Sequence, residues 1–226
     1  MASFTHIVSL GYRCRSTRRL RDYFGLTTAF PFDWWISPIE GLTGFLRRWD
    51  LDHLYDPRCL SIRQRGSSMP YIQHAEYKIG MVHEFPTDRS KLSGKGYLAY
   101  IADARDRTAH LMAKFDKLNR PDRSLLFVRQ LAPVEEKRSR AWAELRQAAL
   151  DRVAAATCTF LLISRSGVTA PGWVPLAVDD PIDEPWSGDP VKWDPAFASL
   201  DFRLERRPGW GTPDTPADLR PETPRP

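Results

Sequence analysis

Short apolar runs alternate with longer amphipathic segments along most of this chain. Four runs are rich in β-branched and aromatic residues and are bounded by glycine, proline or polar residues, which is typical of buried β-strands. They occupy residues 6–10, 75–85, 124–131 and 159–164, and residues 172–178 form a weaker candidate. The run at 75–85 is expected to end as a strand near His83.

Between these runs, apolar residues recur at the spacing of one helix face. The predicted helices cover residues 15–24, 39–49, 95–118 and 135–156. The first is expected to end at Gly25, because glycine readily adopts the left-handed conformation of a helix C-cap. Residues 56–69 show no period and are predicted to be a loop, whereas 194–204 indicates a short helix or strand.

Strands and helices that alternate in steps of ~30–40 residues are typical of βαβ units. The sequence therefore predicts an α/β fold, with a mostly parallel sheet flanked by helices in three layers. Residues 1–205 form the expected single domain. Residues 206–226 carry six prolines and too little apolar surface for a core, so this tail is expected to be disordered.

Composition narrows the functional classes. The chain has 226 residues, is 42% hydrophobic and carries a net charge of +5, with no aromatic-interleaved basic repeat. Nucleic acid is therefore not an expected partner, although anionic ligands are compatible with this charge. We see no signal peptide or membrane-spanning run, so the expected location is cytoplasmic, without membrane association. Three scattered cysteines predict neither a disulfide framework nor a metal knuckle, and no cofactor is expected.

Polar residues follow the predicted strands. Cys14 comes after the first, His83 ends the second, Arg129 lies near the end of the third, and Ser164 and Arg165 end the fourth. Ligands collect at the carboxyl ends of parallel strands in open α/β sheets. If these strands are parallel neighbours, the polar groups converge on one edge of the sheet.

Cys14 is the candidate nucleophile. A helix N-terminus carries partial positive charge and unpaired N–H donors, both of which stabilise a thiolate. Arginines at positions 13, 15, 18, 19 and 21 add positive potential, and the backbone amides of the turn from Gly11 to Cys14 would suit an oxyanion. The alternative is that Cys14 is a small buried apolar residue beside a solvated arginine face.

A thiol nucleophile needs a base, and His83 is the best placed of the five histidines. The third group, which would orient the imidazole, is open. Asp33 lies among aromatic residues and needs a partner there: it either caps the segment that follows or pairs with a histidine or arginine in the site. Glu84 adjoins His83 but would face the other way in a strand.

Three blocks of sequence carry a resemblance. IVSLGYRC at 7–14, FPFDWWISPIEGL at 30–42 and YKIGMVHEF at 77–85 resemble a bacterial family of unknown function identified as papain-like cysteine peptidases. That family shows an S-L-G-x-x-C start, a P-F-D-W block and a later H-[D/E]-F block. The resemblance is close over residues 7–85 and looser up to residue 163.

The resemblance implies Cys14 as nucleophile, His83 as base and Asp33 as a block residue of undefined role. The chain departs from the family at two positions. Glu84 stands where an aspartate is usual, and Arg13 stands where an asparagine is frequent, which changes the expected oxyanion geometry.

The function expected from these residues is a cysteine-dependent hydrolase or acyl transferase that acts on a peptide or another acyl substrate. A serine-type esterase that carries a late catalytic histidine fits poorly, because the last histidine is His110. The alternative of another class is a non-catalytic module for an anionic or glycan-like ligand. The residues expected to contact a ligand in either case are Gly11, Arg13, Trp34, Arg129 and Arg165.

Overall fold

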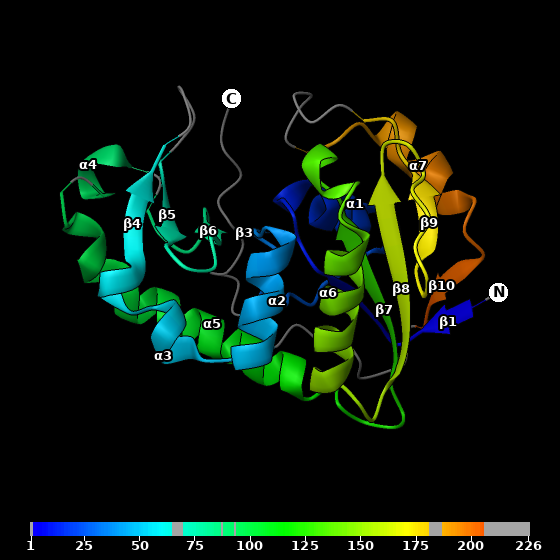
Figure 1. The fold of residues 1–226 in the computed structure, drawn as a ribbon, viewed down its shortest axis with the longest axis horizontal. Coiled ribbons are helices and arrows are strands. Elements are labelled where there is room, and N and C mark those ends of the chain that lie inside the picture. The colour runs from blue at the N-terminus through cyan, green and yellow to red at the C-terminus, as the bar shows by residue number, and fades with distance from the viewer. Residues whose placement is uncertain (1, 65–69, 87, 93, 181–186, 206–226) are drawn as a thin grey trace.

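The computed structural model describes residues 2–64, 70–86, 88–92, 94–180 and 187–205. A parallel four-stranded sheet forms its centre, in the order β2-β7-β8-β9 (Figure 1). The strands are β2 (His6–Ser9), β7 (Ser124–Gln130), β8 (Thr157–Ser164) and β9 (Val174–Ala177). The predicted strands at 6–10, 124–131, 159–164 and 172–178 are confirmed, as is the mostly parallel sheet.

Helices cover both faces of this sheet, because alternate strand residues point to opposite sides. The helices α1 (Cys14–Phe24), α2 (Ile39–Arg48), α6 (Ser139–Arg152) and α7 (Pro190–Ala198) form these layers. Leu126 belongs to the same hydrophobic cluster as Trp193 of α7, whereas its neighbour Phe127 belongs to the cluster that contains Trp142 of α6. The three-layer arrangement is therefore confirmed. α1 also ends as predicted, with Gly25 in the left-handed conformation.

A second, antiparallel sheet was not predicted. Its order is β3-β6-β5-β4, and Figure 1 shows it apart from the parallel sheet, with α2 and α6 between the two. Its strands are β3 (Trp35–Ile36), β4 (Leu60–Arg63), β5 (Tyr71–His74) and β6 (Gly80–Met81). The prediction of a loop over 56–69 was wrong in part, because that stretch holds a short 3-10 helix, η1 (Pro57–Cys59), and β4.

The prediction of a strand over 75–85, parallel to its neighbours, was also wrong. Only Gly80–Met81 is a strand there, and it pairs antiparallel with β3 and β5. The chain turns back just after β5: the N–H of Lys78 donates to the carbonyl of His74, and Lys78 has a φ of 55°. This left-handed residue interrupts the apolar run that had indicated one continuous strand.

The remaining elements complete the fold. They are β1 (Ala2–Phe4), α3 (Leu51–Leu54), α4 (Arg89–Leu92), η2 (Gly96–Tyr100), α5 (Ile101–Asp116), η3 (Pro133–Glu135) and β10 (Phe202–Leu204). The helix predicted at 95–118 thus starts as the 3-10 helix η2 and continues as α5. None of the described helices is both long and apolar enough to span a bilayer.

One hydrophobic cluster includes residues of both sheets, among them Ile72 and Met81 of the antiparallel sheet and Phe127 of the parallel one. The single domain over 1–205 stays a prediction. The tail at 206–226 lies outside the described residues.

Candidate active site

Cys14 lies where the sequence placed it. β2 ends at Ser9, a turn follows, and Cys14 is the first residue of α1. Arg13 is the N-cap in an extended conformation, and its side chain accepts no hydrogen bond from the helix. No acidic residue lies in the first turn. The N-cap side chain therefore leaves the first amides of α1 uncapped within the described residues, and the half-buried Cys14 lies beside them.

Gly11 shapes the turn between β2 and α1. It has a φ of +73°, and a Cβ built on it would lie 2.1 Å from the hydroxyl oxygen of Ser37. The turn is fixed there because the N–H of Ser37 donates to the carbonyl of Tyr12. The amide of Gly11 donates to the hydroxyl of Ser9 at 3.2 Å. The prediction that this amide binds an oxyanion is not supported, since the donor is already engaged.

Replacing Gly11 with alanine is expected to lower the free energy of unfolding by about 1–3 kcal/mol, because the left-handed φ and the overlap with Ser37 both oppose a side chain. Denaturant unfolding measures the effect. The control is Gly94→Ala, since Gly94 has a φ of +63° but nothing within 4 Å of an added Cβ. Equal losses in the two variants would contradict a role for the Ser37 contact, whereas Ser37→Ala should partly rescue Gly11→Ala.

The electrostatics of Cys14 differ from the sequence expectation. Burial raises the pKa of the thiol, and this outweighs its own backbone N–H and the charges of Arg13 and Arg15, which lower it. The prediction of a depressed thiol pKa was therefore wrong. Desolvation disfavours the thiolate more strongly than the helix N-terminus and the neighbouring arginines stabilise it. Cys14 rests as a neutral thiol.

The two arginines that flank Cys14 have different surroundings. The guanidinium of Arg13 lies 5.2 Å from the centre of the Tyr12 ring, in a cation–π contact. Arg15 is buried, and its Nη1 lies 3.4 Å from Oδ2 of Asp180. Arg13 is thus the half-buried cation nearest in sequence to the thiol.

His83 follows β6 and therefore leaves the antiparallel sheet, not the carboxyl edge of the parallel one. Within the described residues, no hydrogen bond or charge interaction joins it to Cys14. Its exposed ring contacts Trp34 edge-on, with ring centres 5.4 Å apart, and desolvation by the surrounding protein lowers its pKa.

A chain of contacts nevertheless links His83 to α1. Arg21 lies two helical turns after Cys14, and its guanidinium lies 5.7 Å from the centre of the Trp34 ring. Since residues seven apart share a helix face, Arg21 and Cys14 face the same side. Trp34 therefore contacts both the guanidinium of Arg21, which starts from the Cys14 side of α1, and the imidazole of His83.

Asp33 does not contact His83. Its Oδ2 accepts the N–H of Phe30 at 3.0 Å and lies 3.7 Å from Nη2 of Arg21. Burial raises its pKa to about 6. Of the alternatives left open by the sequence, pairing with an arginine is the one observed, so Asp33 anchors Arg21 and the turn that carries Trp34.

The prediction that Glu84 faces away from His83 assumed a strand, and the strand β6 ends earlier, at Met81. Oε1 of Glu84 accepts the indole N–H of Trp35 at 2.6 Å, and the Glu84 carbonyl accepts from the guanidinium of Arg107. Burial raises its pKa to about 7. His83 thus contacts Trp34 and Glu84 binds Trp35, so these contacts join residues 83–84 to residues 34–35.

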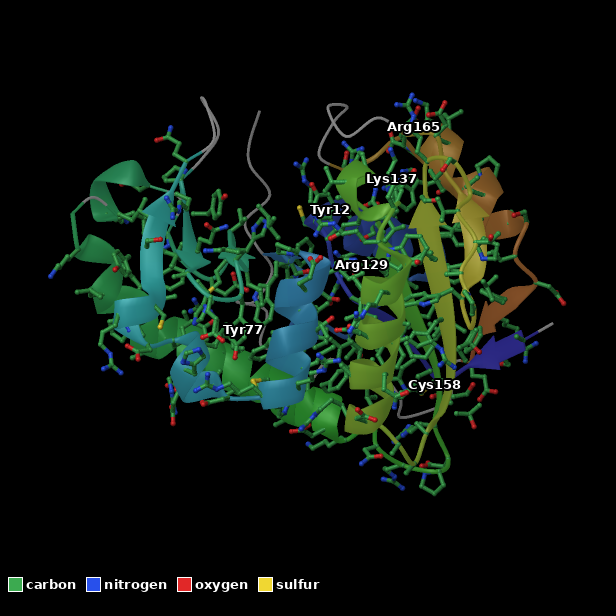
Figure 2. All side chains as sticks on the ribbon, in the orientation of Figure 1. Tyr12, Tyr77, Arg129, Lys137, Cys158 and Arg165 are labelled. Carbon is green, nitrogen blue, oxygen red and sulfur yellow. The ribbon has the colours of Figure 1, made fainter. Side chains whose placement is uncertain are left out.

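Two predicted ligand contacts are engaged elsewhere. Arg129 is fully buried, bonded to Leu10, Ser37 and Glu135, so it cannot reach a ligand as the sequence had suggested. Arg165 is exposed at the end of β8 and pairs with Asp179 at 2.6 Å. Figure 2 shows Tyr12 and Arg165 toward the end of the sheet opposite Cys158. Of the predicted cations, Arg13 alone has no carboxylate partner among the described residues.

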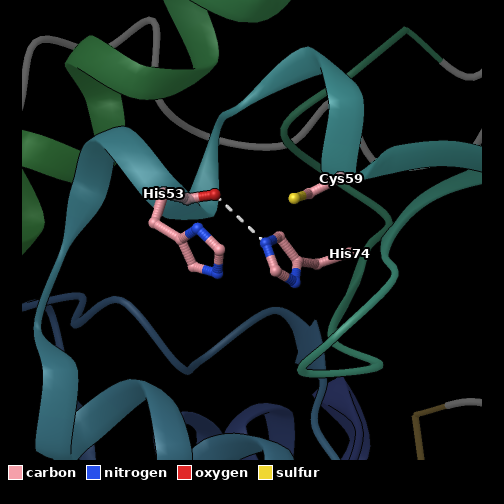
Figure 3. Close-up of side chains that lie close together, drawn as sticks. All are labelled: His53, Cys59 and His74. Atoms are coloured by element: carbon pink, nitrogen blue, oxygen red, sulfur yellow. Dashed lines mark hydrogen bonds between the residues drawn. The ribbon is translucent and has the colours of Figure 1, made fainter.

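A further group of reactive side chains was missed by the sequence reasoning. His53, Cys59 and His74 lie together at the antiparallel sheet (Figure 3). Their spacing matches no short metal-binding motif, and they meet only because β4 pairs with β5. The signal available in the sequence was the presence of two histidines and a cysteine within 22 residues.

No protein-family model matches this chain, and neither a curated protein nor a solved structure resembles it at a significant level. The resemblance to papain-like cysteine peptidases therefore stays an expectation from its three sequence blocks.

Proposed function

We propose that this protein is a cysteine-dependent acyl hydrolase or acyl transferase, with Cys14 as nucleophile and His83 as base. The observation that carries the proposal is the position of Cys14 at the first residue of α1, beside amides that the N-cap side chain of Arg13 does not cap and beside the half-buried Arg13 itself. These amides would stabilise the oxyanion that forms when a thiol attacks a carbonyl.

The proposed reaction starts from neutral groups. The raised pKa of Cys14 and the lowered pKa of His83 both disfavour a resting thiolate–imidazolium pair. His83 takes the thiol proton as the sulfur bonds to the acyl carbon, and then returns that proton to the leaving group. Water, or an acceptor in a transferase, releases the acyl group from the thioester and regenerates the thiol.

His83 needs a path to the sulfur. Because no hydrogen bond or charge interaction joins the two side chains within the described residues, the proton passes through a bridging water or after a shift of the Trp34–His83 contact. Catalytic hydrogen bonds often tighten only when substrate binds. Arg13 favours a substrate that carries negative charge near the acyl group.

The test is acylation of the full chain by p-nitrophenyl acetate, followed by mass spectrometry of the acylated peptide. We expect Cys14 to be acylated much faster than Cys158, and Cys14→Ser to abolish the fast phase. Cys158→Ser is the matched control, since Cys158 is also partly buried, with a raised thiol pKa, but lies near the start of β8. Acylation of Cys14 no faster than that of Cys158 would refute the nucleophile.

His83→Ala tests the base separately. It is expected to slow acylation at neutral pH by about 100-fold, the lower end of general-base contributions. The acylation rate of the wild type should vary little with pH above the lowered pKa of His83. The acylation rate of His83→Ala should instead rise about tenfold per pH unit, in proportion to the fraction of thiolate. His110→Ala is the control, because His110 is an exposed histidine of α5. The same pH profile in His83→Ala and wild type would exclude His83.

A further inference from the structure

His53, Cys59 and His74 form a compact group at the antiparallel sheet, and none of them belongs to the candidate active site. One potential ligand atom from each lies within 4.8 Å of the other two. They come from α3, η1 and β5. The group combines two imidazoles with a thiol, the donor set that zinc prefers.

The backbone holds these residues in place before any ligand binds. Leu60 pairs with His74 across the β4–β5 ladder, and the N–H of Ala75 donates to the carbonyl of Cys59 at 2.7 Å. Asp50 caps α3 by accepting the N–H of His53 at 2.9 Å. A metal would therefore bind to a group that the fold already assembles.

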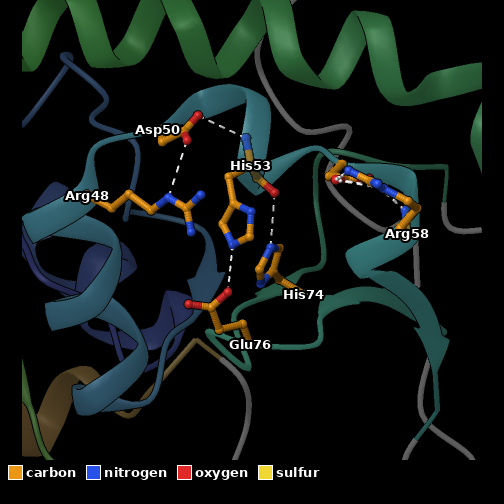
Figure 4. A network of polar contacts seen from close by, with 7 residues as sticks. Arg48, Asp50, His53, Arg58, His74 and Glu76 are labelled. Carbon is orange, nitrogen blue, oxygen red and sulfur yellow. Dashed lines mark hydrogen bonds and ion pairs between the residues drawn. The ribbon is translucent and has the colours of Figure 1, made fainter.

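The ring of His53 is oriented by a carboxylate. Its Nε2 lies 2.7 Å from Oε2 of Glu76, and Figure 4 shows this contact beside the bond from Asp50. A neutral ring that donates its Nε2 proton to Glu76 keeps the lone pair of Nδ1 for a metal. Metal-binding histidines generally donate their other ring N–H to a carboxylate, a backbone carbonyl or water, which fixes the tautomer and raises the basicity of the ligand nitrogen.

His74 is the ligand that has to change its bonds. It is fully buried, its Nε2 donates to the carbonyl of His53 at 3.1 Å, and its Nδ1 accepts the N–H of Tyr77 at 3.1 Å. To bind through Nε2, the ring must carry its proton on Nδ1 instead, which gives up both bonds. Both are hydrogen bonds between neutral groups, which a metal–nitrogen bond can replace.

We propose that His53, Cys59 and His74 bind one zinc ion. Binding forms two metal–nitrogen bonds and one metal–sulfur bond, and the Cys59 thiol loses its proton to solvent. Water takes the fourth tetrahedral position, as in zinc sites with three protein ligands. His53 and Cys59 are only partly buried, which leaves the ion a route from solvent. Mg²⁺ and Ca²⁺ are excluded as occupants, because they require oxygen ligands.

The test is titration of the metal-free full chain with Co²⁺, followed by displacement with Zn²⁺. We expect one equivalent of Co²⁺ to produce a thiolate-to-cobalt charge-transfer band, which Zn²⁺ removes and excess Mg²⁺ does not. Cys59→Ser should abolish the band, while Cys14→Ser and Cys158→Ser should keep it. Absence of the band, or its survival in Cys59→Ser, would overturn the proposal.

The histidines are tested by affinity. His53→Ala is expected to weaken Zn²⁺ binding at least 100-fold, and Glu76→Gln to weaken it about 10- to 100-fold, because the carboxylate that orients His53 is lost. His74→Ala can fail to fold because His74 is buried, so His74→Asn is measured beside it by circular dichroism and Zn²⁺ titration. Unchanged Zn²⁺ affinity in a folded His74 variant would overturn the three-ligand site. These outcomes do not depend on acylation of Cys14, so the two proposals fail independently.

Discussion

Replacing Arg129 with methionine is expected to lower the free energy of unfolding by about 3–5 kcal/mol, the usual cost of removing one partner of a buried ion pair. Nη2 of Arg129 donates to both carboxylate oxygens of Glu135, at 2.7 and 2.9 Å. The two side chains are 0% and 4% exposed. The variant would leave the Glu135 charge buried without its partner.

The pair also joins three parts of the site. Nη1 of Arg129 donates to the carbonyl of Leu10 at 2.8 Å, which fixes the turn before Cys14. Glu135 accepts the N–H of Ile39 at 2.9 Å, where α2 begins, and the N–H of Ala132 at 3.1 Å. Loss of the pair would therefore free the end of β2 and the start of α2 together.

Urea unfolding of a double-mutant cycle measures this effect. Arg129→Met and Glu135→Gln should each destabilise strongly, and the double variant should lose less than the sum of the single losses, because no unpaired charge remains. Arg138→Met is the matched control, since Arg138 pairs with Glu40 at the surface, with exposures of 50% and 54%. It should cost less than ~1 kcal/mol. A similar small loss for Arg129→Met would contradict the role of the pair.

The sequence predicted the parallel sheet well because local patterns specify it. The runs at 6–10, 124–131 and 159–164 are apolar on both faces, which is typical of strands covered by helices on two sides. The same reasoning placed Cys14 at the start of α1, since a strand, a glycine and an amphipathic segment follow one another directly. This half of the candidate site depends on residues that are neighbours in the chain.

The antiparallel sheet could not be predicted in the same way. β3 and β6 have only two residues each, and their pairing depends on contacts between residues some 45 positions apart. The apolar run up to Val82 looks continuous in the sequence, yet Lys78 breaks it with a left-handed turn. The location of His83 was therefore predicted on the wrong sheet.

For Arg129 and the thiol of Cys14, the sequence predicted the position in the chain but not the surroundings of the side chain. An arginine at a strand end looks like a ligand contact, and only the fold shows that Glu135 takes its charge. Likewise, the helix N-terminus and the arginines pointed to a low thiol pKa, whereas the burial that raises it depends on packing from distant segments. Burial and partner choice are tertiary properties, so motif reasoning did not foresee either.

The second large effect concerns pH. Glu84→Gln is expected to gain about 3 kcal/mol of stability relative to wild type as the pH rises from 4.5 to 7, because each unit of pKa shift corresponds to about 1.4 kcal/mol. Burial raises the pKa of Glu84 from 4.5 to about 7, so the native state retains a proton that the unfolded chain releases. The contribution of Glu84 to the stability of the wild type is therefore at its maximum below pH 4.5 and is lost as the pH rises through 7.

The measurement has to be a difference between variants, because other groups titrate in the same window. Asp33, with a pKa raised to about 6, adds a loss of the same sign, while His6, with a pKa lowered to about 4, makes stability rise with pH. Urea unfolding at several pH values, with Glu84→Gln compared against wild type, cancels both contributions.

The amide introduced by Glu84→Gln would keep an oxygen that can accept the indole N–H of Trp35. The variant therefore retains an acceptor for the hydrogen bond that is 2.6 Å long in the wild type. A difference between Glu84→Gln and wild type that does not change with pH would show that this carboxyl has an ordinary pKa and that water reaches it beside Trp35.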